Sequence, residues 1–250
     1  MSGHSKWATI KRSKGKTDAA RGKLFNKFIR EITVAARMGG GEIESNPRLR
    51  SAITSARTAN MPGKNIESAI LKGTGQLEGV SYEEINFEGY GPGGIAVVVE
   101  CLTDNRNRTV SEVRHTLTKH GGNLGQTNSV AWMFKSKGVI RVPKDAMPED
   151  RLMEIALEAG AEDLSLQDDE FEITTAFEAF ETVRQALEKA NVKMASAEIS
   201  KIADNPVTVE GENAAKVMRL LEALEELDDT QHVYSNFDIS EETMQKLEKE

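Results

Sequence analysis

The strongest constraint on how this 250-residue chain folds is a change in charge and periodicity near residue 72. The first 72 residues carry 15 Lys and Arg against 5 Asp and Glu, and their apolar residues recur at helical spacing. The remaining 178 residues carry 17 Lys and Arg against 35 Asp and Glu, and they mix strand and helix patterns. Such segregation indicates a polyanionic partner for the basic part or, alternatively, docking of that part on the acidic remainder.

The basic segment predicts three helices. The first covers residues 17–38 and ends at three consecutive glycines, which do not readily continue a helix. Asn46 and Pro47 supply a cap and a first helical position for the second helix. A shorter third helix ends at Gly73. These helices predict an N-terminal domain of their own.

Beyond residue 80 the apolar pattern predicts alternating strands and helices. Residues 138–203 give the order strand, helix, strand, strand, helix, strand, which is that of a ferredoxin-like unit. A helix over 212–227 and a strand over 231–237 have no partners near them in the sequence. The other expected elements are strands over 84–88, 95–102 and 130–134, with a glycine-rich turn between the first two and a helix over 105–120.

The unpartnered C-terminal elements predict the domain organisation. If they complete the sheet that begins at residue 84, the ferredoxin-like unit is inserted into that sheet. We therefore expect a multi-domain α+β protein. Its parts are an N-terminal three-helix domain (1–79), a discontinuous α/β-sandwich domain (80–137 plus 204–250) and an inserted ferredoxin-like βαββαβ domain (138–203).

Composition narrows the class of protein further. The chain is 38% hydrophobic and 29% charged, which is typical of globular proteins. No run approaches the ~18 apolar residues of a membrane span, and no secretory signal core follows the first residues. Its one cysteine, Cys101, lies in an apolar run and is expected to be a buried core thiol. These features predict a cytoplasmic protein with no membrane partner.

A cationic stripe on the first helix is one candidate nucleic-acid interface. At roughly 100° per residue, Lys23, Lys27, Arg30 and Arg37 fall in one narrow arc opposite the apolar side. Such a stripe can follow a phosphate backbone, because each neutralised phosphate releases counterions. The alternative is the ordinary charged face of an amphipathic helix, although that face usually mixes signs. We expect the stripe to face solvent.

Two other clusters indicate the same kind of partner. The segment before the first helix combines basic residues with Trp7, a pairing that favours single-stranded nucleic acid. Residues 104–109 offer Asn, Arg and Thr groups that contact phosphates and base edges, although Asp104 or Asn105 alternatively only caps the following helix. The candidate nucleic-acid-binding residues are His4, Lys6, Trp7, Lys11, Arg12, Lys14, Lys16, Arg21, Lys23, Lys27, Arg30, Arg37, Arg50, Arg57, Arg106, Arg108, His115 and Lys119.

Catalytic and metal-site patterns fail on inspection. Gly15, Lys16 and Thr17 lack the upstream glycine of a phosphate-binding loop. The glycines of residues 89–94 match a dinucleotide pattern, but β-branched residues follow where a helix should begin. The four histidines lack zinc-site spacing, and the acidic run at 225–229 is expected to be solvated charge. We expect no enzyme, no cofactor and no metal.

Several segments closely resemble the YebC family, in order and over essentially the whole chain. One departure is Asn128, where the family commonly has Gly; because Asn tolerates the left-handed region, we expect the same turn. The matching segments are SGHSKWATIK (2–11), RGKLF (21–25), NPRLR (46–50), EGYGPGG (88–94), DNRNRT (104–109) and GGNLG (121–125).

The resemblance implies a three-domain, non-enzymatic protein that acts in gene expression. Bacterial members are usually assigned as DNA-binding transcriptional regulators. Mitochondrial relatives, which include the translational activator of a cytochrome oxidase subunit, and some bacterial members act in translation and ease ribosomes through stretches such as consecutive prolines. The expected partner is therefore DNA or, alternatively, ribosomal RNA on the ribosome.

The residues themselves leave three classes of function open. No clear recognition helix or dimer seam is evident, and the acidic remainder would repel a long duplex, which favours RNA and a monomer. The family assignment favours DNA. The third class is a protein–protein scaffold whose basic helices dock on an acidic partner.

Overall fold

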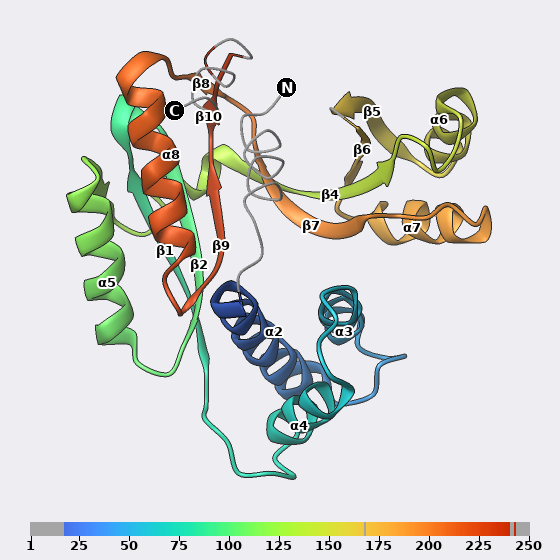
Figure 1. Cartoon of the computed structure of the whole chain (residues 1–250), viewed down its shortest axis with the longest axis horizontal. Coiled ribbons are helices and arrows are strands. Elements are labelled where there is room, and N and C mark those ends of the chain that lie inside the picture. Colours follow the sequence, from blue (N-terminus) through green and yellow to red (C-terminus); the bar gives the residue numbers. More distant parts are fainter. Residues whose placement is uncertain (1–17, 168, 241–242, 244–250) are drawn as a thin grey trace.

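The computed structural model describes residues 18–167, 169–240 and 243, which form an α+β structure (Figure 1). The elements gather into three groups: basic helices near the N-terminus, a first sheet with two helices on one face, and a second sheet with two helices. The predicted multi-domain α+β class is confirmed in this coarse sense. Within the described part, no helix is both long enough and apolar enough to cross a lipid bilayer.

The N-terminal group consists of α2 (Asp18–Gly39), α3 (Pro47–Thr58) and α4 (Gly63–Gly73). As predicted, Asn46 caps α3: its Oδ1 accepts the Leu49 N–H at 3.1 Å. The Asn46 amide also donates to the carbonyls of Ala35 and Gly40, at 2.8 Å each. One side chain thus fixes both the end of α2 and the start of α3. The core of this group includes Ile32, Leu49, Ile53, Met61 and Ile66.

The first sheet has the strand order β3 (Asn123–Leu124), β1 (Glu83–Tyr90), β2 (Ala96–Thr103), β9 (Thr230–Ser235). The pairing of β2 with β9 confirms that the C-terminal elements complete the sheet that begins near residue 84. In the turn between β1 and β2, Gly93 and Gly94 have φ angles of 75° and 77°, which glycine adopts without strain. Two short strands that the sequence analysis did not predict, β8 (Val207–Thr208) and β10 (Phe237–Asp238), pair in parallel.

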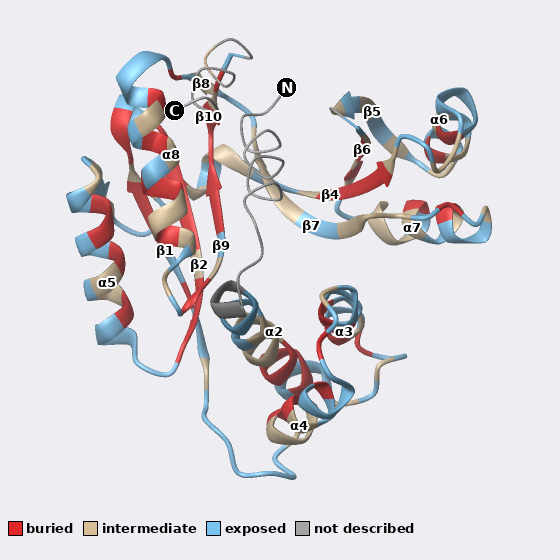
Figure 2. Ribbon diagram, in the orientation of Figure 1, coloured by how far each residue is buried: buried red, intermediate tan, exposed pale blue. Residues whose placement is uncertain are grey.

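Helices α5 (Arg106–Lys119) and α8 (Gly211–Glu225) cover one face of this sheet. Their apolar sides pack on the strands, and Figure 2 shows buried segments alternating with exposed ones along both helices. Cys101 is 2% exposed in this core, and burial raises the pKa of its thiol to about 12. The prediction of a buried core thiol is confirmed. The core also includes Val113, Leu117, Val217, Leu220 and Val233.

The second sheet has the strand order β5 (Ala161–Gln167), β6 (Glu170–Ala176), β4 (Phe134–Pro143), β7 (Ser196–Ala203), with every neighbouring pair antiparallel. Helices α6 (Glu149–Glu158) and α7 (Phe180–Lys189) pack on it through Leu152, Val183 and Leu187. Along the chain these elements follow the strand and helix order that the sequence predicted.

The strand predicted over 130–134 is wrong. Residues Ala131–Met133 form a 3₁₀ turn, and β4 begins only at Phe134. The cause is Glu88, whose carboxylate accepts the backbone N–H groups of Asn128 (2.6 Å), Val130 (2.8 Å) and Ala131 (2.7 Å). This clamp bends the backbone into a turn in which Asn128 has φ 66°, the left-handed conformation that was expected.

We expect Glu88→Gln to lower the free energy of unfolding by about 2 kcal/mol, because a buried charge-assisted acceptor of three hydrogen bonds becomes neutral. Burial raises the pKa of Glu88, but the three backbone donors outweigh it and place that pKa below its ordinary value. Urea unfolding measures the effect. Glu158→Gln makes the same change at an exposed side chain and serves as the control. Equal stability of the two variants would contradict the clamp.

Candidate nucleic-acid interface

Part of the predicted interface lies outside the described residues, and its role stays a prediction. This part is the segment before α2, with His4, Lys6, Trp7, Lys11, Arg12, Lys14 and Lys16. The other candidates lie on α2, α3 and α5, and the structure gives their surroundings.

The cationic stripe of α2 is turned toward the rest of the protein. Lys23 Nζ donates to the Glu226 carbonyl at 3.2 Å, and Lys27 Nζ donates to the Glu225 carbonyl at 2.9 Å. These carbonyls end α8, where the helix dipole places partial negative charge and where the last turn holds no basic residue. The stripe therefore complements the acidic end of α8.

Arg30 continues this contact at a buried carboxylate. Its Nη1 lies 2.6 Å from Asp229 Oδ1 and donates to the carbonyls of Asp228 (2.6 Å) and Leu102 (3.2 Å). The expectation that the stripe faces solvent is wrong for Lys27 and Arg30, because both are at least partly buried. Their contacts agree with the alternative, in which the basic part docks on the acidic remainder of the chain. Whether the stripe also meets nucleic acid stays a prediction.

Asp229 joins three elements, and its side chain is 1% exposed. Besides Arg30, it accepts hydrogen bonds from Arg108 (2.7 Å), Thr109 (2.6 Å) and Thr103 (3.1 Å). Burial raises the pKa of Asp229, but the bonds from Thr109 and Arg108 and the charge of Arg30 outweigh it and lower that pKa below its ordinary value. The expectation of solvated charge is therefore wrong for this residue of the acidic run at 225–229.

The loop before α5 divides into a structural part and an exposed part. Asn105 Oδ1 accepts the Arg108 N–H at 3.1 Å, so the capping alternative for this residue is confirmed. The Arg108 side chain, although exposed, pairs with Asp104 (2.8 Å) and with the buried Asp229, so its charge is already balanced within the protein. Arg106 is exposed on the first turn of α5.

The remaining candidates on α2 and α3 differ in their contacts. Arg37 donates to Ser81 Oγ at 2.6 Å and so holds the linker, whereas Arg50 lies 3.9 Å from the Glu44 carboxylate. Arg21 and Arg57 are exposed.

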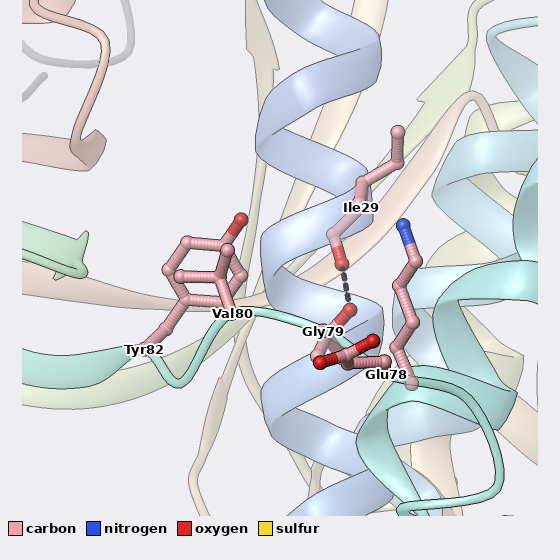
Figure 3. A pocket seen from close by; sticks show the side chains of 7 residues that line it. Ile29, Glu78, Gly79, Val80 and Tyr82 are labelled. Atoms are coloured by element: carbon pink, nitrogen blue, oxygen red, sulfur yellow. Dashed lines mark hydrogen bonds between the residues drawn. The ribbon is translucent and has the colours of Figure 1, made fainter.

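The linker after α4 also contacts α2. A pocket of about 420 Å³ lies between α2, Lys72 of α4 and linker residues 78–82 (Figure 3). Thr33 Oγ1 donates to the Ile29 carbonyl at 2.7 Å along its wall, and Arg30 lies 5.5 Å from the centroid of the Tyr82 ring. The charged residues that line this pocket are one lysine and one glutamate, so it has no net positive charge to attract a polyanion.

The outer side of α5 is one cationic surface that stays open. None of its exposed residues carries a carboxylate, and Glu112 is half-buried. Among the described residues, Arg106, Arg114 and Lys119 form no ion pair. His115 and Lys119 are exposed as predicted. Arg114 is also exposed and was missed, because at roughly 100° per residue it lies outside the strip that His115 and Lys119 share. The exposed residues are Arg106, Asn107, Arg108, Ser111, Arg114, His115, Thr118 and Lys119.

These features define an α+β protein whose basic helical end is docked on an acidic body. Within the described residues, no three His, Cys, Asp or Glu side chains gather in a way that suits a metal ion. The sequence pattern described as the TACO1/YebC protein N-terminal domain matches residues 5–76, and that of the TACO1/YebC second and third domain matches residues 82–237. The chain belongs to the TACO1/YebC family.

Relatives with high identity extend over the whole chain. A protein of Syntrophobacter fumaroxidans is 54% identical over 248 residues, and one of Geobacter sulfurreducens is 56% identical over 247 residues. Each alignment covers 99% of this chain and 100% of the relative, and both relatives are named probable transcriptional regulatory proteins. The crystal structure of a conserved hypothetical protein from Aquifex aeolicus has a TM-score of 0.84 and 52% identity, and it covers 90% of this chain and 93% of that one.

Asp229→Asn is expected to lower the free energy of unfolding by about 3 kcal/mol, because it leaves Arg30 and Arg108 without their buried counter-charge. The folded-state pKa of Asp229 is lowered, so its contribution is complete above the unfolded value of about 3.9 and is lost as pH falls through the folded value. The stability difference between wild type and variant should therefore shrink in acid.

Urea unfolding at pH 7 and at several acidic pH values measures both effects. Asp145→Asn, at an exposed carboxylate, is the control. A difference that stays constant with pH, or an equal loss in the control, would rule out the proposed role of Asp229.

Proposed function

We propose that this protein is a non-enzymatic regulator of transcription that binds DNA. The observation that carries the proposal is the outer side of α5, where Arg106, Arg114 and Lys119 are exposed and form no ion pair with a described residue. The names of the relatives support a regulatory role. A surface of this kind neutralises phosphates and releases counterions.

The geometry of α5 suits contact along a nucleic-acid backbone. Its 14 residues give a length of about 21 Å, which corresponds to roughly six phosphates of one strand. Arg106 and Lys119 lie at the two ends of the helix, with Arg114 and His115 between them. Asn107, Ser111 and Thr118 supply hydrogen-bonding groups that contact phosphates or base edges.

In this proposal the segment before α2 adds further phosphate contacts and the Trp7 ring. Arg21, Arg50 and Arg57 extend the basic surface over α2 and α3. Lys23, Lys27, Arg30 and Arg37 hold α2 in place, and they meet phosphates only if α2 leaves α8 and the linker. We further propose that the protein is a cytoplasmic monomer.

We also propose the domain boundaries that the sequence predicted. These are a helical domain over 1–79, a discontinuous α/β domain over 80–137 plus 204–250, and an inserted ferredoxin-like domain over 138–203. The pairing of β2 with β9 supports the discontinuous domain, and the separate apolar core under β4 and β6 supports the inserted one.

The triple variant Arg106→Glu, Arg114→Glu, Lys119→Glu is expected to lower DNA affinity at least thirty-fold at low salt. Because about three phosphate contacts disappear, the log–log slope of affinity against salt should flatten by about 2.7. Fluorescence anisotropy with a labelled duplex over a salt series measures both quantities.

The matched control replaces Lys144, Lys189 and Lys193 by Glu. These lysines are exposed around the second sheet, and their replacement changes the net charge by the same amount. If both triple variants lose affinity alike, the effect is one of net charge and the α5 surface is not the interface. A parallel titration with a ribosomal RNA fragment identifies the polymer. If the protein binds that RNA more tightly than the duplex, RNA and not DNA is the partner.

A further inference from the structure

A basic pocket lies where the end of α5 meets the beginning of α8. Its volume is about 470 Å³, and its lining includes Lys119 and His120 from α5 and its cap, with Asn213, Lys216 and Arg219 from α8. No carboxylate lines it. These residues form no motif in the sequence, because at least 92 positions separate the α5 residues from those of α8.

The positive charge of this pocket is only partly balanced within the described residues. Lys216 lies 2.8 Å from Glu212, whose side chain is 80% exposed and is not part of the lining. Arg219 Nε donates to the Ala215 carbonyl at 3.3 Å, and no described residue accepts from its two terminal nitrogens. Lys119 forms no ion pair with a described residue. Three cations thus line one open volume, and among the described residues only Lys216 forms an ion pair, with the exposed Glu212.

The pKa of His120 reflects the positive electrostatic potential in the pocket. Burial lowers the pKa of its imidazole, and the charges of Lys119 and Arg219 lower it further. A histidine whose protonation is opposed by neighbouring cations marks a place where an added anion is stabilised.

We propose that this pocket binds a phosphate group of the DNA strand that runs along α5. The pocket is continuous with the α5 surface because Lys119 belongs to both. The planar Arg219 guanidinium suits two oxygens of one phosphate, and the two lysines act as point charges beside it. The Asn213 amide adds a hydrogen-bond donor. This inference rests on the proposed function for its ligand, since free phosphate shares the same chemistry.

The test uses the full-length protein with inorganic pyrophosphate and a labelled duplex as probes. Binding of pyrophosphate should raise the pKa of His120, measured by NMR titration of the imidazole, whereas the imidazole signals of His232 on β9 should not respond to pyrophosphate. In the double variant Lys216→Gln, Arg219→Gln, this response should disappear and DNA affinity should fall about tenfold. The control Lys144→Gln, Lys193→Gln removes equal charge elsewhere and should change neither.

Each outcome decides one claim. If pyrophosphate leaves His120 unchanged in the wild type, the pocket is not a phosphate site, whatever DNA does. If pyrophosphate shifts His120 but the double variant keeps full DNA affinity, the site takes free phosphate only and the strand-binding role is overturned. Failure of the proposed function looks different: DNA fails to bind the wild type, while the His120 response to pyrophosphate persists.

Discussion

The placement of the basic helices depends on the buried carboxylate of Asp229. It receives Arg30 from α2, Arg108 and Thr109 from α5, and Thr103 from the end of β2. A buried charge is tolerated only when it is paired and fully hydrogen-bonded, so removing either arginine leaves the rest of this cluster uncompensated. One side chain therefore couples the helical group to the first sheet. This coupling explains why a strongly basic segment and a strongly acidic one share one chain.

Docking changes what the charge segregation means for function. Lys23 and Lys27 donate hydrogen bonds to the last carbonyls of α8. The excess of 15 basic over 5 acidic residues in the first 72 is therefore partly neutralised inside the molecule. One surface that stays open belongs to α5, in the acidic part of the chain. Net charge over a long segment was thus a poor guide to which cations stay exposed. The pairing of each cation with its neighbours decides that.

Much of the fold could be predicted because its signals are local. The Asn46 and Pro47 start of α3, the buried Cys101 and the strand and helix order of the second sheet all depend on neighbouring residues or short periods. The errors involve distant partners. Glu88 bends a loop 40 residues away, and Thr103 meets Asp229 126 residues away. No pattern in the sequence reports such a contact, so a strand was predicted at 130–134 and solvated charge at 225–229. For the candidate site, helical arithmetic sufficed to predict that His115 and Lys119 are exposed, but it could not show that the exposed Arg108 is paired with the distant Asp229.

Helix α8 carries its charges in an order that its own dipole does not favour. Glu222, Glu225 and Glu226 lie at the C-terminal end, where negative charge is destabilising, and the last turn holds no basic residue. The lysines of α2 compensate that end from outside the helix. Lys216, in the second turn of α8, pairs with the exposed Glu212, and Arg219, near the middle of the helix, forms no ion pair with a described residue. One end of the helix is thus compensated by docking, whereas its cations Lys216 and Arg219 line an open pocket that has no carboxylate in its lining, and this asymmetry is the physical basis of the proposed anion site.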